Sequence, residues 1–338
     1  MIRKLSYLLL GALFIGFFIV NLSSFSEGQS QETGLTPVLN EIIQQVKKED
    51  LEKHLRILTG ADPFTLNGVE YRITSRNTFH PDIQLAVEYI VNSLESSGYS
   101  VEKTPLSFDY AVKKVAFENL TAQITGDLYP DEFYILVANY DSCAGLEKNY
   151  DPLTDPTPGA DDGATGITVV LALAKIFKNY HFNYSIEFLF TGGHEQGLWG
   201  GRYYAMDAVE TGKKIKGAIY SQRLGPEPKA KRSKLKIIYN NHGKWSVFDP
   251  SPLARTFLEV NGDLTFGIKP ILIFSPQQIA ADFIAFWEWG IPAVVVGDFS
   301  NSNYHTFKDK PENIDFDFLT EATRIIGAAA AYLAEVGK

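Results

Sequence analysis

The stretch from Phe133 to Ser142 reads FYILVANYDS, and the predicted fold depends on the pattern that it contains. Its first six residues, 133–138, form an unbroken apolar run with the length of a strand that is buried on both faces. Polar residues begin where the run ends, at Asn139 and Asp141. Because sites in parallel sheets gather beyond the carboxyl ends of the strands, the residues after position 138 are where a site is expected.

Similar runs occur along the rest of the chain, and helical segments separate several of them. Strand-like apolar or alternating patterns cover 99–108, 115–124, 184–190, 217–220, 235–239 and 293–296. Apolar residues at helical spacing cover 37–60, 81–98, 167–177 and 318–336. Strands that alternate with helices predict an α/β fold, with a mixed, largely parallel central sheet sandwiched by helices.

The composition excludes some classes of partner. The chain has 338 residues, of which 45% are hydrophobic and 21% are charged, as in ordinary globular proteins. Its formal net charge is −9. A nucleic-acid surface requires clustered Lys and Arg, so we expect no nucleic-acid partner. The one short basic stretch, 229–236, reads as a solvated loop.

The N-terminus has the pattern of an export signal. Arg3 and Lys4 precede an apolar run from Leu5 to Val20, and a polar tract follows it. This run is short for a membrane-spanning helix and long for the core of a signal peptide. We predict that residues 1–30 are a signal peptide or an N-terminal signal anchor. In the second case, residues 5–20 would anchor the protein in the membrane. Residues 31–338 would then form a single exported domain, either periplasmic, secreted or anchored facing outward.

Cys143 is the only cysteine of the chain. An intramolecular disulfide and a zinc cluster built from cysteines are therefore excluded. Cys143 follows Ser142 in a predicted loop near the expected site. It can be read as a catalytic thiol or as a small buried residue, and the usual behaviour of free cysteine favours the second reading.

Three residues at the ends of predicted elements have the chemistry of metal ligands. Asp161 precedes the helix at 167–177, Glu195 follows the strand at 184–190, and His305 lies beyond the last strand. Two carboxylates and one imidazole suit zinc, and three protein ligands leave a fourth position open, as in catalytic sites. Zinc would polarise a substrate carbonyl there and lower the pKa of the water molecule bound to it. Taken alone, each residue has a simpler explanation, such as helix capping for Asp161.

Five short motifs in one order strengthen the metal hypothesis. They are Tyr140–Ser142, Pro158–Asp162, Glu195–Gly200, Gly290–Ala293 and Tyr304–Thr306. The set resembles metallopeptidase family 28, which includes bacterial leucyl aminopeptidases, glutamate carboxypeptidase relatives and glutaminyl-peptide cyclases. The resemblance covers about residues 75–335. It implies a zinc-exopeptidase-like domain that acts on peptide or protein N-termini.

This chain departs from the family pattern in one half of the two-metal site. The resemblance implies that Asp161 is the bridging ligand and that Glu195 and His305 complete the set for one zinc. The two remaining ligand positions of the other zinc are Asn139 and Gln222, and neutral amides are poor zinc ligands. We therefore expect one zinc ion.

Two further positions follow from the same resemblance. Asp141 matches a family residue that supports a ligand histidine. In this sequence, Asn139 occupies the position of that histidine. The family's general base is a glutamate immediately before the ligand glutamate, and His194 takes its place. An imidazole with a pKa near ~6.5 can accept a proton, so His194 is the candidate catalytic residue. It could instead bind zinc itself.

Several functions remain open from the sequence. The retained ligands favour a zinc exopeptidase that hydrolyses peptide N-termini. The altered positions Asn139, His194 and Gln222 favour a catalytically inactive pseudopeptidase that binds peptides or protein partners. The loop Asp151–Pro158 resembles that of the cyclases and favours a glutaminyl-peptide cyclase-like acyltransferase. A membrane-tethered structural domain without metal is the remaining alternative.

Overall fold

A computed structural model describes residues 35–110, 113–228, 230, 234–240, 251–275 and 283–337. The predicted export segment, residues 1–30, lies outside these ranges. Within the described part of the chain, no helix has both the length and the apolar character needed to cross a membrane.

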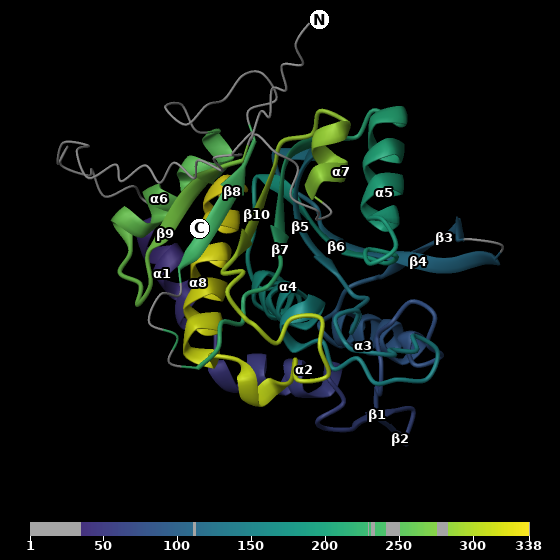
Figure 1. The fold of residues 1–338 in the computed structure, drawn as a ribbon. Coiled ribbons are helices and arrows are strands. Elements are labelled where there is room, and N and C mark those ends of the chain that lie inside the picture. Colours follow the sequence, from purple (N-terminus) through teal and green to yellow (C-terminus); the bar gives the residue numbers. More distant parts are fainter. Residues whose placement is uncertain are drawn as a thin grey trace, which may run out of the picture.

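A mixed sheet lies at the centre of the described structure (Figure 1). Its eight strands have the order β3-β4-β6-β5-β7-β10-β8-β9, and the central pairs β6–β5, β5–β7 and β7–β10 are parallel, as is β8–β9 at one edge. The strands are β3 Glu102–Tyr110, β4 Lys113–Ile124, β5 Tyr129–Asn139, β6 Tyr184–Thr191, β7 Lys214–Ser221, β8 Leu235–Tyr239, β9 Pro270–Phe274 and β10 Ala293–Gly297.

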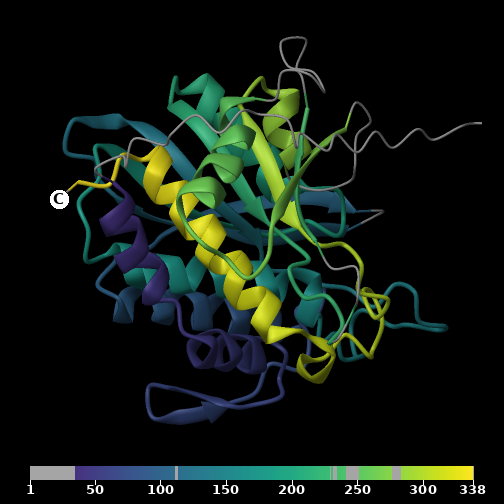
Figure 2. The same cartoon turned by 90° about the vertical axis from the view of Figure 1, so that its left-hand side faces the viewer.

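Helices cover both faces of this sheet (Figures 1 and 2). One face packs against α1 Thr36–Gln44, α2 Lys48–Leu58, α3 Ile83–Ser96, α4 Thr165–Phe177, α6 Pro252–Asp263 and α8 Phe316–Leu333. The other face packs against α5 Trp199–Glu210 and α7 Phe283–Glu288. This arrangement confirms the predicted mixed α/β fold with helices on both sides of the sheet.

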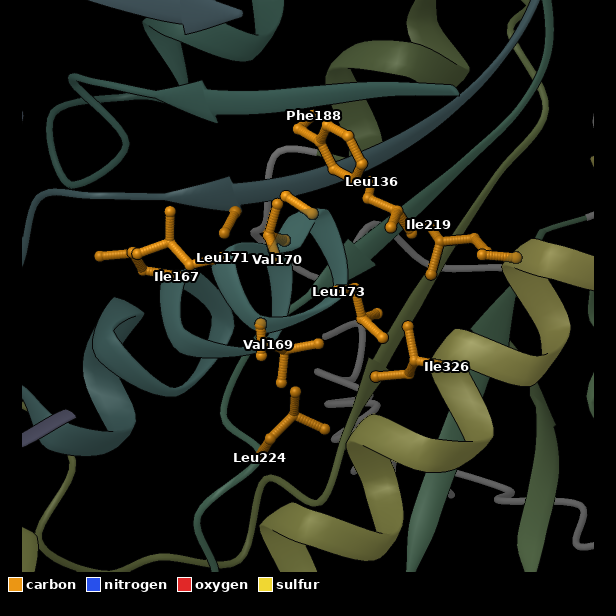
Figure 3. Packing of buried hydrophobic residues seen from close by; sticks show 14 of the residues in the cluster. Leu136, Ile167, Val169, Val170, Leu171, Leu173, Phe188, Ile219, Leu224 and Ile326 are labelled. Carbon is orange, nitrogen blue, oxygen red and sulfur yellow. The ribbon is translucent and has the colours of Figure 1, made fainter. Parts of the chain in front are cut away.

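The apolar run of β5 explains why both faces are buried. Leu136 points into the core around α4, whereas Ile135 and Val137 point into the core under α5 and α7. Figure 3 shows the first of these cores, in which Leu173 of α4 lies between the sheet and Ile326 of α8. Burial of one such side chain contributes about 1.5–3 kcal/mol, so a strand that alternates between two cores is strongly fixed in register.

The N-terminal helix predicted over 37–60 is two helices, α1 and α2. The break lies at Gln45–Lys47, although Val46 within it is buried and keeps the apolar spacing. Glu49 and Asp50 lie in the first turn of α2, where the helix dipole favours acidic side chains. The break allows α1 to pack along α8 while α2 reaches both α4 and α8.

Some elements were not predicted from the sequence. Helices α5, α6 and α7 and strand β9 are absent from the expected set, as is the hairpin of β1 Phe64–Leu66 and β2 Val69–Tyr71. That hairpin turns at Asn67 and Gly68, which both have positive φ, and Asn-Gly is a recognised hairpin signal. None of these elements changes the edge of the sheet at which the site was expected.

Strand register brings the polar segments together at one edge. Asn139 at the end of β5 pairs with Thr191 of β6, and Val296 of β10 pairs with Ser221 of β7. The loops that follow these four parallel strands therefore start side by side, as the general rule for parallel sheets requires.

Gly166 provides a test of the contact between α4 and β7. A Cβ atom at this position would lie 2.1 Å from the carbonyl oxygen of Ser221, closer than packing permits. Because helix and strand can separate only by opening the core, we expect Gly166→Ala to lower the free energy of unfolding by about 3 kcal/mol. Denaturant unfolding followed by circular dichroism measures this change.

Gly262 in α6 is the matched control, since a Cβ atom there meets nothing within 4 Å. Gly262→Ala should leave stability unchanged or raise it by about 0.5–1 kcal/mol, the difference in helix propensity. Equal effects of the two substitutions would contradict the packing described here.

Candidate metal centre

Four side chains from three loops converge at the carboxyl edge of the sheet. Cys143 follows β5, Asp162 precedes α4, Glu195 follows β6 and His305 follows β10. One possible ligand atom of each lies within 4.8 Å of the corresponding atoms of the others. His305 Nε2 is 3.5 Å from Asp162 Oδ2 and 3.4 Å from Glu195 Oε2. We refer to these four residues as the ligand cluster.

The structure brings Glu195 and His305 together but directs Asp161 elsewhere. Asp161 Oδ1 accepts a hydrogen bond from the Gly225 amide at 2.8 Å, and its Oδ2 lies 3.7 Å from Arg223 Nε. The carboxylate that faces His305 is that of the next residue, Asp162. This differs from the sequence assignment, in which Asp161 was the ligand.

A sharp backbone turn explains why adjacent aspartates face different partners. Asp162 has φ −85° and ψ 88°, and Gly163 has a φ of +83°, so the backbone is not helical at these two positions before α4 begins. Successive side chains therefore diverge. Asp161 points towards Arg223 and Asp162 points into the ligand cluster.

The ligand cluster contains buried polar atoms without hydrogen-bond partners. They are Asp162 Oδ1, Glu195 Oε1 and His305 Nε2. Buried polar atoms are nearly always paired because desolvation without a partner is costly. Carboxylate, imidazole and thiol groups are also the donors that zinc prefers, so the residues present fit a bound zinc ion.

The charge balance indicates a cation in the same place. Burial raises the pKa of Asp161 well above its usual value, and repulsion from Asp309 adds to this effect. Burial and repulsion from Glu195 do the same to the pKa of Asp162. Burial alone would also raise the pKa of Glu195, but the neighbouring imidazoles of His305 and His194 hold that pKa at about 2. A dication would favour the charged form of all three carboxylates.

A buried arginine holds the loops that carry the cluster. The guanidinium of Arg76 donates all five of its N–H groups to backbone carbonyl oxygens, over 2.7–3.1 Å. The acceptors are Leu58, Tyr140, Pro158, Gly159 and Asp162. Burial lowers the pKa of Arg76 to about 10, so it remains protonated at neutral pH.

Asp309 fixes the same turn from the opposite side. Its carboxylate accepts the backbone N–H groups of Asp161 at 2.8 Å and Asp162 at 2.9 Å. Burial raises the pKa of Asp309 to about 6. Neither Asp309 nor Arg76 was predicted from the sequence. Asp309 follows shortly after the motif Tyr304–Thr306, and this proximity could have indicated a role in the site. Arg76 lies outside the five motifs identified in the sequence, so no such indication existed for it.

The altered positions form a connected polar network beside the ligand cluster. Gln222 Nε2 lies 3.3 Å from His194 Nε2, and His194 Nδ1 lies 3.3 Å from the Tyr220 hydroxyl. That hydroxyl donates to Asn139 Oδ1 at 2.5 Å, and Asn139 Nδ2 donates to the carbonyl of Asp141 at 2.9 Å. These donors and acceptors match if His194 is neutral and carries its proton on Nδ1. We refer to this hydrogen-bonded series of residues, from Gln222 through His194, Tyr220 and Asn139 to Asp141, as the amide network.

Asp141 supports the loop that carries Glu195. Its carboxylate accepts the backbone N–H groups of His194 at 3.1 Å and Glu195 at 3.0 Å, and the Thr78 hydroxyl at 3.0 Å. The residue therefore orients the backbone of two site residues. Asp141 therefore orients the loop after β6. The family resemblance implied a different role, support of a ligand histidine at the position that Asn139 occupies here.

Two residues of the site have left-handed backbone conformations. Arg223 has a φ of +52° and His305 a φ of +62°, which cost non-glycine residues of order 1–3 kcal/mol. Arg223 stacks on the ring of Tyr304, with its guanidinium carbon 3.8 Å from the ring centroid. Strain of this kind persists where the surroundings impose it, and it concentrates at functional sites.

Comparisons with known proteins agree with this architecture. A family model described as "Peptidase family M28" matches residues 119–330. A probable zinc metalloprotease of Pyrenophora tritici-repentis is 22% identical over 330 residues, which cover 85% of this chain. The chain spans 66% of that relative, just under two thirds of its length.

Two solved structures share the fold. An aminopeptidase from Aneurinibacillus sp. strain AM-1 superposes with a TM-score of 0.68 at 16% identity, over 89% of this chain and 97% of that one. A glutaminyl cyclase from Fimbriiglobus ruber gives 0.66 at 18% identity, over 84% and 95%. The family match covers more than half of the chain and includes the whole ligand cluster. This protein belongs to peptidase family M28, a family of zinc peptidases.

Proposed function

We propose that this protein is a one-zinc exopeptidase that acts on the N-termini of peptides. The supporting observation is the ligand cluster, in which one ligand atom each of Asp162, Glu195 and His305 lies within 4.8 Å of the others. Each of the three residues also has a buried polar atom without a hydrogen-bond partner. The family's other metal position offers Asn139 and Gln222, whose amides are engaged in the amide network. The retained half of the site therefore has the ligands for one ion, and the altered half lacks them.

Zinc in this site would supply a Lewis acid that polarises the carbonyl of the scissile peptide bond. The chain itself supplies orientation. Asp141 holds the backbone of Glu195, and Arg76 holds the backbone of Asp162, so both carboxylates are fixed before a substrate arrives. Such pre-organisation is a main source of enzymatic rate enhancement.

His194 is the residue that we propose as the general base. Its Nε2 lies 3.9 Å from Glu195 Oε1, beside the ligand cluster. In the proposed reaction, this nitrogen exchanges its contact with Gln222 for the attacking water and accepts a proton from it. The hydrogen bond between Nδ1 and Tyr220 keeps the ring oriented during that exchange.

One observation favours the pseudopeptidase as a second candidate. Both ring nitrogens of His194 already lie 3.3 Å from polar partners, Tyr220 on one side and Gln222 on the other. If the amide network does not open, the site keeps its ion and can bind peptide N-termini without hydrolysing them. Substrates with N-terminal glutamine belong in the same assay, because the cyclase-like alternative would act on them.

We further propose that the protein is exported through the basic end and apolar run at residues 3–20. A reporter enzyme that is active only outside the cytoplasm, fused after residue 36, should be active. A matched fusion in which Leu8, Leu9 and Leu10 are replaced by Asp should lose this activity. Absence of reporter activity in both fusions, with the reporter recovered from the cytoplasm in each, would contradict export.

The proposed ion stoichiometry is tested by metal analysis of the purified protein. We expect one zinc per chain, lost in His305→Ala because an imidazole donor is removed. Asp162→Asn should lower the zinc content far more than Asp161→Asn, since only Asp162 faces the ligand cluster. Two tightly held zinc ions would refute the single site, and the reverse order of the aspartate variants would restore Asp161 as the ligand.

The role of His194 is tested by its replacement. If it is the base, His194→Ala should lower kcat on aminoacyl substrates by about 10²–10⁴-fold, and His194→Glu should retain or raise it. The zinc content of both variants serves as the control for an intact site. Equal turnover in wild type and His194→Ala would exclude the role, and zinc-loaded wild type without turnover would favour the pseudopeptidase.

A further inference from the structure

We propose that Cys143 is a fourth protein ligand of the ion held by Asp162, Glu195 and His305. The inference rests on the metal site of the proposed function and extends it. The resemblance to the family gave this ion two carboxylates and one imidazole, whereas the structure adds a sulfur atom to the same cluster. Cys143 Sγ lies within 4.8 Å of a candidate donor atom on each of the other three residues.

The backbone holds Cys143 in this position. Its amide N–H donates to Asp162 Oδ2 at 2.8 Å, which joins the loop after β5 to the turn before α4. The preceding residue, Ser142, is held by hydrogen bonds from its amide to the carbonyl of Arg76 and from its hydroxyl to Thr157. The thiol is therefore fixed beside the ligand cluster by several elements at once.

The surroundings of Cys143 do not match those of a cysteine that only fills a core. The residue is half-buried, and its titratable neighbours are the carboxylates of Asp162 and Glu195. Asp162 is fully buried, yet its Oδ1 has no hydrogen-bond partner, and Glu195 Oε1 has none either. Unpartnered carboxylate oxygens around a thiol are what a shared metal ion would satisfy.

The additional ligand changes the kind of site. Three protein ligands leave a position for water, as in catalytic zinc sites, whereas four close the tetrahedral shell, as in structural sites. When the sulfur–metal bond forms, the thiol releases its proton to solvent, so uptake of the ion frees one proton from Cys143. Turnover would then require the sulfur to leave the ion, and Cys143 would limit the activity of the enzyme.

Cobalt(II) in place of zinc tests this ligand by absorption spectroscopy of the full-length chain. A thiolate bound to cobalt gives an intense charge-transfer band in the near ultraviolet, whereas oxygen and nitrogen ligands give only weak visible bands. We expect the intense band in the wild type and its loss in Cys143→Ser, with the visible bands retained. Because the chain has no other cysteine, no second thiolate can produce the band.

The outcomes separate this inference from the proposed function. Visible bands without a charge-transfer band in the wild type would overturn the role of Cys143 and leave the one-ion site intact. Absence of all cobalt bands would remove the metal site as well. Competition with a chelator gives a second measure, in which Cys143→Ser should weaken zinc binding roughly tenfold or more. Cys143→Ala, measured beside it, separates loss of the sulfur from effects of a serine hydroxyl.

Discussion

The buried guanidinium of Arg76 is the interaction on which the rest of the site depends. Its five N–H groups join the end of α2, the residue after β5 and the turn before α4 into one rigid unit. Removing it would take a hydrogen bond from each of five carbonyl oxygens and a positive charge from beside the neighbouring aspartates. The positions of Cys143 and Asp162 therefore follow from a residue that lies outside the five motifs identified in the sequence.

The sequence predicted the edge of the sheet at which the site forms, and the reason is physical. A strand buried on both faces is mostly apolar, so the polar residue that follows its last apolar run marks its end. Asn139 and Thr191 are such residues, and the structure pairs them in register. Glu195 and His305 were predicted to meet because each follows a parallel strand, and the structure brings them within 3.4 Å of each other.

The choice between Asp161 and Asp162 could not be predicted from the sequence. Both are acidic, both follow a glycine-containing turn, and the backbone angles at Asp162 and Gly163 decide which carboxylate faces the ligand cluster. Cys143 was read as a packing residue because burial is the usual fate of a lone cysteine, and its neighbours come from loops distant in sequence. Long-range contacts of this kind leave no trace in composition or periodicity.

The amide network has a consequence for how this site can evolve. Asn139, His194 and Gln222 are linked through Tyr220 in one series of hydrogen bonds, so each residue has a structural partner at a position for which the family resemblance implies a metal ligand or the general base. Replacement of Asn139 or Gln222 alone by a carboxylate or imidazole residue would break a buried hydrogen bond and supply only one of the two ligands that the family resemblance implies there. Variants with only one of these replacements would therefore be less stable and would still lack a complete second set of metal ligands. Under the proposed one-zinc function, this coupling disfavours a stepwise gain of a second set of metal ligands at these positions.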